Sequence, residues 1–528
     1  MKQYNSPIAS MMMLLMLVLV PHLFDSSMFE VMASSAADDH QAPLIRDEEQ
    51  QHLTEDEFWE ADERALEGLR GHKNSKSGKS DTDSSEICII GGGPSGLTAA
   101  LRLHDKGYND VVLFEKEDAI GGRTQNWIDP EGGVHNAGAI LLLRPFYDRT
   151  QELLDRFGLS GTEWPTPSVN YFYNKDVPFV IDRTLLPGPD PNEVAAQITK
   201  YALLYQGWET EFVPGFPNGV SQDLSAPMMT LLAQHDLLLL APFFHAIVTA
   251  SGYGSLEITP AIFMIQVMHP GLLVAWVTGQ PVLDRVNFEA LFQLVAEESE
   301  ADILLNAEIT NVKYGRKSIH VEYTLYGTPK NQKCDHLIHA IPYGSNSDTA
   351  PFSFDQDQED VLNQLVYEPY WTTFVKMSEL EFGERYYPVL FPSATGLTYG
   401  EFEGVGEPIG LFKQLQVSPY VSVYSWHKPP LPGGFSNTEV NALTDQYLGW
   451  LNLNKDEDGN PIPLEIEANF EWSAYFPHVI TEAIDNGWFQ DLENLQGYRK
   501  TYFTGGYRTM DTIESVVRSA EDIIDRFF

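Results

Sequence analysis

The sequence of 528 residues is long enough for two or more lobes with large cores, since 43% of its residues are hydrophobic and 12% are aromatic. Its 75 acidic and 33 basic residues give a formal net charge of −42 at pH 7, which repels nucleic acids and anionic membrane surfaces. We therefore expect no nucleic-acid partner and attribute the acidity to a strongly solvated surface.

The N-terminus has the layout of a secretory signal peptide. Lys2 precedes an apolar run over residues 11–20, and small residues follow over residues 33–37. The run is shorter than the ~20 residues that a membrane-spanning helix needs, and no later stretch is long and apolar enough to span a membrane. We predict a signal peptide over residues 1–37, a secreted or endomembrane-lumen protein, and no stable membrane span.

Residues 38–85 are polar and charged, with few side chains able to enter a core, and we expect a disordered linker there. The chain has only two cysteines, Cys88 and Cys334. That number excludes a framework of several disulfides, despite the predicted signal peptide.

A β-α-β pattern begins directly after this linker. An apolar run over Ile87–Ile90 leads into glycines, helical apolar spacing follows over Leu97–Leu103, and a second strand is expected at Val111–Phe114. Later patterns predict helices over 191–205, 228–240 and 288–298, strands over 303–314, 318–323 and 337–341, and a last strand, glycines and helix over 500–528.

Gly91, Gly93 and Gly96 form the motif G-x-G-x-x-G between the first strand and the helix. The first glycine permits a tight turn, the second lets the backbone approach a pyrophosphate, and the third lets helix and strand pack closely. Glu115 ends the next strand, where an acidic side chain can accept hydrogen bonds from ribose hydroxyl groups. Gly122 and Arg123 then offer close backbone and charge-assisted hydrogen bonds to a second phosphate. These motifs predict a dinucleotide cofactor.

The run Glu115-Lys-Glu-Asp-Ala-Ile-Gly-Gly-Arg123 resembles the flavin-containing amine oxidase superfamily, whose members return a C-terminal segment to the flavin. The matching segment here is Tyr502-Phe-Thr-Gly-Gly506 followed by Thr512–Ser519. The resemblance implies FAD as the cofactor. It implies FAD contacts at Gly91, Gly93, Ser95, Gly96, Glu115, Lys116, Gly122, Arg123, Gly138, Ala139, Ile309, Gly505, Gly506, Thr512 and Ile513. The superfamily's Gly-Glu is Gly505-Gly506 here, which removes one expected side-chain contact.

Within this superfamily the chain resembles the polyunsaturated (polyenoic) fatty acid isomerases. The residues that carry this resemblance include His135-Asn-Ala-Gly-Ala-Ile-Leu141, Gly252-Tyr-Gly254, Tyr475-Phe-Pro-His-Val479 and the final Asp525-Arg-Phe-Phe528. The resemblance implies that double bonds of a lipid substrate move into conjugation by internal hydride transfer through flavin N5. The protein then has to supply an apolar tunnel that excludes water.

Aromatic residues from the middle of the chain are candidates for the wall of that tunnel: Tyr147, Phe172, Tyr173, Tyr253, Phe263, Trp276, Tyr475 and Phe476. Among them we predict substrate contacts from Tyr253, Tyr475 and Phe476. The bacterial isomerases hold the fatty-acid carboxylate with an arginine in a strand that should match Pro165–Tyr173, which has no Lys or Arg here. Arg144 is our candidate for that role, and Arg183 is the second.

The expected fold class is α/β. It combines a Rossmann-type FAD-binding lobe, assembled from residues 86–164, 285–345 and 480–528, with an α+β substrate-binding lobe, from residues 165–284 and 346–479. Two other functions stay open: an FAD-dependent oxidase or cyclising dehydrogenase acting on an amine or a secondary metabolite, and a non-catalytic FAD-binding protein. We interpret His478 as structural. No metal-binding or hydrolase motif is present, and the sequence leaves the oligomeric state open.

Overall fold

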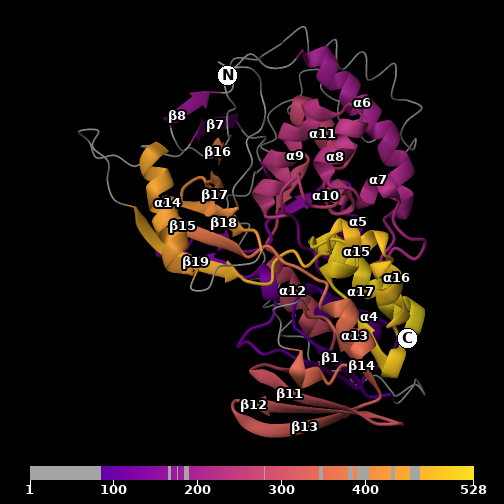
Figure 1. Cartoon of the computed structure of the whole chain (residues 1–528). Coiled ribbons are helices and arrows are strands. Elements are labelled where there is room, and N and C mark those ends of the chain that lie inside the picture. The colour runs from indigo at the N-terminus through magenta and orange to yellow at the C-terminus, as the bar shows by residue number, and fades with distance from the viewer. Residues whose placement is uncertain are drawn as a thin grey trace, which may run out of the picture.

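The structure is a computed structural model (Figure 1). It describes residues 85–164, 168–174, 177–182, 190–278, 280–343, 349–377, 384–388, 404–429, 435–451 and 464–528. The predicted signal peptide and almost all of the predicted linker lie outside the described residues.

A five-stranded parallel sheet forms the centre of the cofactor-binding part. Its strands are β1 (Ile87–Ile90), β2 (Val111–Phe114), β10 (Asp302–Leu304), β14 (His336–His339) and β20 (Thr501–Phe503), in the order β10-β2-β1-β14-β20. Both faces are covered, because Cys88 and Ile90 enter one hydrophobic core while Ile87 and Ile89 enter another. A continuous apolar run such as Ile87–Ile90 is typical of a parallel strand buried on both faces.

Three helices pack on one face of this sheet. They are α4 (Pro94–Asp105), α12 (Phe288–Glu298) and α17 (Ile513–Phe527), and α4 contacts both of the others. The helix predicted over 288–298 has these bounds, and the strands predicted at Ile87–Ile90 and Val111–Phe114 are also confirmed. The first and last described segments of the chain therefore lie side by side, as the close approach of α4 and α17 shows (Figure 1).

A three-stranded antiparallel sheet, β11 (Ala307–Tyr314), β12 (Ile319–Leu325) and β13 (Thr328–Cys334), lies at the bottom of Figure 1. The prediction of one strand over 303–314 is wrong, because the backbone turns at Asn306, whose φ is 53°, and places β10 and β11 in different sheets. The two cysteines pair: Cys88 of β1 and Cys334 of β13 form a disulfide. The sequence excluded a larger framework but did not predict this pair.

The second large sheet has seven strands in the order β19-β15-β18-β17-β16-β7-β8. The strands are β7 (Ser168–Asn174), β8 (Val177–Asp182), β15 (Tyr370–Lys376), β16 (Glu384–Pro388), β17 (Val405–Phe412), β18 (Tyr420–His427) and β19 (Glu465–Trp472). All neighbours are antiparallel except β7 and β16. Helix α14 (Asn437–Leu451) packs against it.

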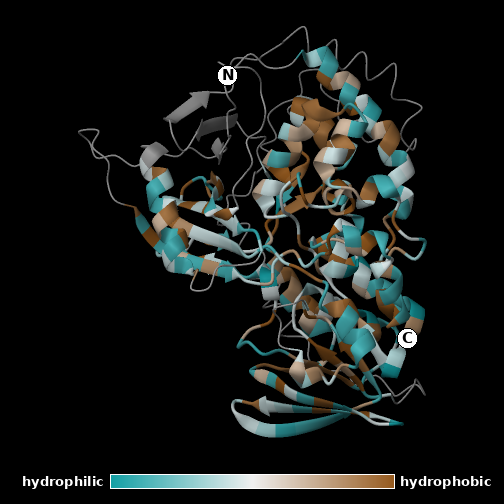
Figure 2. Cartoon of the chain, in the orientation of Figure 1, coloured by the Kyte–Doolittle hydropathy of each residue, from teal (hydrophilic) through white to brown (hydrophobic). Residues whose placement is uncertain are grey.

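A group of helices completes the molecule: α6 (Pro191–Trp208), α7 (Gln222–Ser225), α8 (Met228–Gln234), α9 (Ala241–Ile247), α10 (Ala261–Val267) and α11 (Pro270–Thr278). The helix predicted over 228–240 is wrong in length, since Asp236 at φ 48° ends it. Figure 2 shows that α9 to α11 are mostly hydrophobic. Among the described residues no single helix is long and apolar enough to cross a bilayer. The bent pair of α10 and α11 is long and apolar enough only when the two helices are taken together.

Smaller elements connect these parts. They are β3 (Asn126–Ile128) with β4 (Val134–Asn136), β5 (Leu141–Leu143) with β9 (Leu283–Arg285) and β6 (Thr162–Glu163), and the helices α5 (Asp148–Phe157), α13 (Gln356–Leu362), α15 (Thr481–Asp485) and α16 (Trp488–Asn494). The predicted α/β class with a Rossmann-type sheet is confirmed. The described strands of the parallel sheet come from segments 86–164, 285–345 and 480–528, and those of the seven-stranded sheet come from 165–284 and 346–479.

Candidate functional site

A cavity of about 1290 Å³ runs from the carboxyl ends of the parallel strands to the seven-stranded sheet and the helical group. Ligands bind at this edge of parallel sheets in α/β proteins. Most of the predicted FAD contacts line it: Gly91, Gly93, Ser95, Glu115, Lys116, Gly122, Arg123, Gly138, Ala139, Ile309, Gly505, Gly506, Thr512 and Ile513. The predicted substrate contacts Tyr253 and Tyr475 also line it.

Helix α4 points its N-terminus at this cavity. Its N-cap residue is Gly93, no side chain caps the helix, and its first turn has no acidic residue. The helix dipole and the first backbone N–H groups are therefore available to an anion. A Cβ on Gly96 would lie 2.0 Å from the Gly91 carbonyl oxygen, so Gly96 serves close packing of strand and helix and does not line the cavity.

Two more glycine turns close around the same point. A Cβ on Gly122 would lie 3.2 Å from the Cα of Gly93, and one on Gly138 would lie 2.0 Å from the carbonyl oxygen of Arg123. Side chains other than hydrogen would push these turns apart. The backbone is thus free to approach a ligand from the β1 and Gly121–Arg123 sides at once.

Glu115 is buried at the end of β2. One carboxylate oxygen accepts the backbone N–H of Gly92 at 2.7 Å, and the other accepts that of Glu117 at 2.9 Å. Each carboxylate oxygen has a further lone pair. Glu115 therefore stabilises the glycine turn and can still accept a hydroxyl group from a ligand in the cavity.

The C-terminal segment brings a second helix N-terminus to the cavity. Gly505 has φ 141°, and the side chain of Thr512 caps α17 by accepting the backbone N–H of Ser515 at 3.2 Å. The hydroxyl groups of Ser95 and Thr504 lie 3.0 Å apart and join this segment to the start of α4. The glycine turns around the start of α4 and the segment from Gly505 to Thr512 therefore surround one part of the cavity, which we call the cradle.

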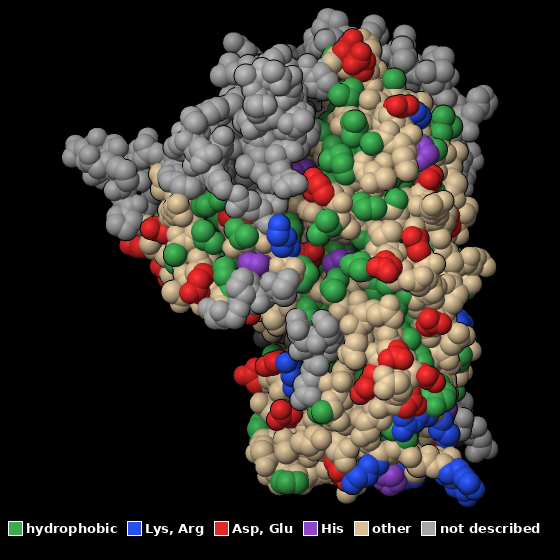
Figure 3. All heavy atoms as spheres, in the orientation of Figure 1, with side chains coloured by type: hydrophobic (Ala, Val, Ile, Leu, Met, Phe, Trp, Pro, Cys, Tyr) green, Lys and Arg blue, Asp and Glu red, His purple; other side chains and the backbone are tan. Residues whose placement is uncertain are grey.

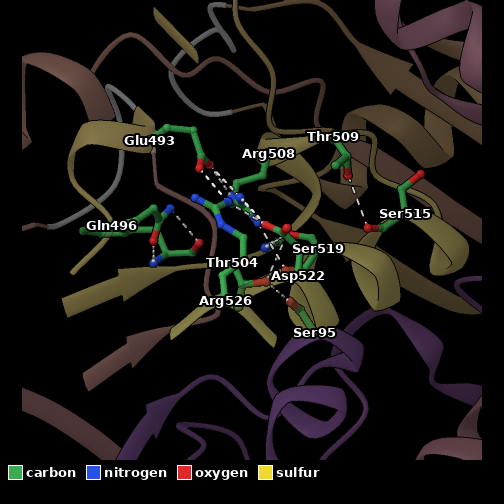
Figure 4. Close-up of polar contacts among 12 residues, drawn as sticks. Ser95, Glu493, Gln496, Thr504, Arg508, Thr509, Ser515, Ser519, Asp522 and Arg526 are labelled. Atoms are coloured by element: carbon green, nitrogen blue, oxygen red, sulfur yellow. Dashed lines mark hydrogen bonds and ion pairs between the residues drawn. The ribbon is translucent and has the colours of Figure 1, made fainter. Parts of the chain in front are cut away.

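A buried polar network supports the cradle from behind (Figure 4). Thr504 Oγ1 lies 3.0 Å from Ser519 Oγ, which accepts the backbone N–H of Gly505 at 3.3 Å. Arg508 donates to both the carbonyl and the hydroxyl oxygen of Ser519, at 3.2 and 3.3 Å. Its guanidinium group, fully buried, also pairs with Glu493 at 2.5 Å and with Asp522 at 2.8 Å. No motif in the sequence predicts this network.

Arg123 has a carboxylate partner within the protein. Its two terminal nitrogens donate to the two carboxylate oxygens of Asp511 at 2.5 and 2.7 Å, and its guanidinium carbon lies 5.5 Å from the centre of the Tyr475 ring. The expected hydrogen bond from Arg123 to a phosphate stays a prediction, but the charge that it was to supply is already paired. Asp511 also lines the cavity, although no sequence motif predicts a role for it.

Another part of the cavity has an aromatic wall, which consists of Tyr253, Tyr475, Tyr370, Tyr424 and Phe412. Successive ring centres are 5.7, 4.6, 5.9 and 5.0 Å apart, with interplanar angles of 18° to 30°. The hydroxyl of Tyr253 donates to the Asp511 carbonyl and that of Tyr475 to the Ser251 carbonyl. Burial raises the pKa of both phenols well above the ordinary value, so they stay neutral.

The remaining aromatic candidates divide between cavity and core. Tyr147 and Trp276 line the cavity, whereas Phe263 lies in the core. Phe476 does not line the cavity either: it is fully buried, and its ring stacks on that of His478 with centres 4.1 Å apart. The side chains of Phe172 and Tyr173 lie outside the description. No sequence pattern distinguishes Tyr370, Phe412 and Tyr424, which line the cavity, from ordinary core aromatics.

Arg144 is not among the described residues that line the cavity. Its Nε lies 2.7 Å from Asp284, and a terminal nitrogen lies 3.9 Å from Glu163, so its charge is already paired. Lys116 and Arg123 are the only Lys or Arg among the described lining residues. Arg183, the second candidate for the carboxylate anchor, lies outside the described residues. The structure therefore does not place Arg144 where a substrate carboxylate in the cavity would reach it.

His478 has a structural environment. Its Nδ1 donates to the carbonyl of Phe476 at 2.8 Å, and burial lowers its pKa to about 4. A neutral, hydrogen-bonded ring in a core is not a proton donor to the cavity. In the part of the chain that the structure describes, no group of three or more His, Cys, Asp or Glu side chains is arranged to bind a metal ion.

Comparison with known proteins places this geometry in context. The sequence profile of the family described as flavin containing amine oxidoreductase matches residues 94–377. The FAD-dependent oxidoreductase pigF of Monascus ruber is 25% identical over 449 residues, which cover 80% of this chain and 87% of that protein. The polyenoic fatty acid isomerase of Ptilota filicina is 27% identical over 208 residues, which cover 35% of this chain and 41% of that protein.

The solved structures include a similar fold. The CLA-producing fatty acid isomerase from P. acnes superposes with a TM-score of 0.72 at 22% identity, over 85% of this chain and all of that one. At that identity the likeness concerns the fold.

The cradle fits FAD. The uncapped N-terminus of α4 and three glycine turns are suited to a pyrophosphate, and Glu115 is suited to a ribose. Together with the family match and the FAD-dependent relatives, this arrangement confirms FAD as the cofactor.

Proposed function

The chain belongs to the flavin-containing amine oxidoreductase family, and we propose that it is an FAD-dependent isomerase that moves double bonds of a polyunsaturated fatty acid into conjugation. The observation that carries the proposal is that the FAD cradle and the aromatic wall line one continuous cavity. The fold of the fatty acid isomerase from P. acnes and the partial match to the Ptilota enzyme support it.

The chain's own residues have three tasks in this reaction. The rings of the aromatic wall provide an apolar lining for a chain of double bonds. Apolar side chains of the helical group, such as Ile247, Val267 and Leu272, extend the cavity away from the cradle. Both surfaces exclude water from the reacting carbons. FAD held by the glycine turns at Gly91, Gly122 and Gly505 would supply reversible hydride transfer, and an isomerisation of this kind would consume no external oxidant.

Anaerobic incubation of the holoenzyme with linoleate, arachidonate or eicosapentaenoate tests this proposal. We expect new ultraviolet absorbance of a conjugated diene or triene at constant total unsaturation, because an isomerase returns the hydride that it removes. No conjugated product from any of the three acids would contradict the proposal. A boiled holoenzyme sample controls for autoxidation.

A second candidate is an FAD-dependent oxidase or dehydrogenase that acts on an amine or a secondary metabolite. It is favoured by the oxidoreductase relatives and by the pairing of Arg123 with Asp511, which leaves no unpaired cation among the described residues at the aromatic end to hold a carboxylate. Oxygen consumption with peroxide release would support an oxidase. A flavin that no substrate reduces and an absence of any product would instead support a non-catalytic FAD-binding protein.

A further inference from the structure

Asp511 joins three segments that are far apart in the sequence. Its carboxylate accepts the two hydrogen bonds from Arg123, at 2.5 and 2.7 Å, and the backbone N–H of Phe476 at 2.9 Å. Its carbonyl accepts the hydroxyl of Tyr253 at 3.0 Å. The Gly121–Arg123 turn, the segment before α15 and the loop before α10 therefore meet at one residue.

The pair of Arg123 and Asp511 is strong by its geometry and its burial. The two parallel hydrogen bonds form the bidentate arrangement that arginine and carboxylate favour. The side chain of Asp511 is 4% exposed and that of Arg123 is 31% exposed. Removal of the carboxylate would leave a partly buried guanidinium group beside Tyr475 without a counter-charge.

Phe476 depends on the same carboxylate. Its φ of 49° lies in the left-handed region, which residues other than glycine rarely adopt, and its side chain is fully buried. Such a conformation persists only where surrounding contacts maintain it. The bond to Asp511 satisfies the Phe476 N–H, and the preceding residue is Tyr475, whose ring lies between Tyr253 and Tyr370 in the aromatic wall.

Asp511 also lies directly against the cofactor cradle. A Cβ on Gly506 would be 2.5 Å from the Asp511 Oδ1 atom. Only glycine at position 506 therefore leaves room for the carboxylate, and Gly506 itself lines the cavity. One side chain thus contacts both the C-terminal cofactor segment and the backbone that carries the aromatic wall.

We propose that Asp511 is a positioning residue that couples the FAD cradle to the aromatic wall by holding Tyr475 and Phe476 in their places. The identity of the substrate that contacts this wall rests on the proposed function, whereas the coupling between cradle and wall does not depend on it. Asp511 acts through Arg123 and the Phe476 backbone and has no chemical step of its own.

Hydrogen exchange of the holoenzyme tests the coupling without any substrate. In Asp511→Ala the Phe476 N–H loses its acceptor, and we expect its exchange to be at least about tenfold faster than in the unmodified protein. Asp511→Asn keeps an acceptor of the same size but loses the charge, so its exchange should be intermediate. The control Asp525→Asn breaks an exposed ion pair with Arg102 and Lys106 at the other end of α17. Equal Phe476 exchange in Asp511→Ala and Asp525→Asn would overturn the proposal.

Kinetics of the folded Asp511→Asn variant give a second measurement, which also serves if Asp511→Ala does not fold. We expect kcat/KM for the fatty acid to fall by about tenfold or more, because a misplaced wall lowers the fraction of productive orientations. The FAD dissociation constant, measured by flavin fluorescence, should change much less than kcat/KM. An equal loss in both quantities would assign Asp511 to cofactor binding alone and contradict the coupling. Absence of conjugated product from the unmodified enzyme would overturn the proposed function but leave the exchange result valid.

Discussion

Glu368 is a carboxyl group buried behind the aromatic wall, directly between the lining residues Tyr367 and Pro369. Its backbone N–H donates to the Tyr475 carbonyl at 3.0 Å, but its Oε2 atom has no hydrogen-bond partner among the described residues. Burial raises its pKa to about 8, and the charge of Lys428 offsets this only in part. Glu368 therefore holds its proton at neutral pH in the folded protein.

We expect Glu368→Gln to change how stability depends on pH. The pKa of the Glu368 carboxyl group is about 8 in the folded protein, whereas its ordinary value, which applies to the unfolded chain, is 4.5. Between these values the folded state binds more protons than the unfolded state, so the unmodified protein loses stability as the pH rises. The amide of the variant does not titrate. As the pH rises, the free energy of unfolding should therefore fall less in the variant than in the unmodified protein, by at most ~1.4 kcal/mol per pH unit.

Melting temperatures of both proteins between pH 5 and pH 8 check this expectation. The melting temperature of the variant should rise steadily relative to that of the unmodified protein from pH 5 to pH 8, because the two proteins share all other titrating groups. A difference in melting temperature that is constant from pH 5 to pH 8 would show that Glu368 is ionised at neutral pH.

At the scale of elements, the network around Arg508 fixes α17 and the Gly505 turn to the start of α4 (Figure 4). Glu493 and Asp522 are shared by two arginines, Arg508 and Arg526. Arg508 is fully buried, whereas the Arg526 side chain is 40% exposed. Replacement of Arg508 leaves these two carboxylates with Arg526, which is partly exposed, as their remaining counter-charge.

We expect Arg508→Met to lower the free energy of unfolding by about 3–5 kcal/mol and to weaken FAD binding, because Ser519 and Gly505 lose their support. The matched control is Arg526→Met, which removes a cation from the same two carboxylates but at the surface, where an ion pair contributes about 0–1 kcal/mol. Denaturant unfolding and flavin release measure the two effects. If the two variants lose equal stability and equal FAD affinity, Arg508 has no special role in the cradle.

The elements that the sequence predicted best are those with local signals. The strands Ile87–Ile90 and Val111–Phe114 and the glycines between them are specified by adjacent residues, and so is the capped helix α17. The contacts of Asp511 and Arg508 join residues 11 to 388 positions apart. Such contacts have no periodicity along the chain. The cradle could therefore be predicted from its glycine motif, whereas the contacts of Asp511 and Arg508 that support it, and most of the aromatic wall, could not.

At the scale of the whole molecule, acidic and basic side chains are distributed differently over the surface. On the face in Figure 3 acidic side chains are widely spread, and Lys and Arg side chains gather mainly at the lower end, near the sheet of β11 to β13. The cavity lies above that end, between the parallel sheet and the hydrophobic helices of Figure 2. This arrangement suits a neutral or apolar substrate better than a polyanion.

The disulfide between Cys88 and Cys334 links the central strand β1 to the end of β13, and both cysteines are fully buried. Disulfides form and persist in oxidising compartments. We therefore propose that the protein matures in the secretory route, in agreement with the signal peptide predicted over residues 1–37. A chain kept in a reducing cytosol would carry two buried thiols in its place.

We expect the protein purified from a secreting host to have no free thiol when it is denatured without reductant, and two after reduction. Cys334→Ala should lower the free energy of unfolding by about 2–5 kcal/mol, because the crosslink no longer restricts the unfolded chain. Maleimide labelling followed by mass measurement gives the thiol count, and denaturant unfolding gives the stability. The same preparation reports the mature N-terminus, which should fall near residue 38. Two free thiols in secreted, unreduced protein would contradict the disulfide, and retention of residues 1–37 would contradict cleavage of the signal peptide.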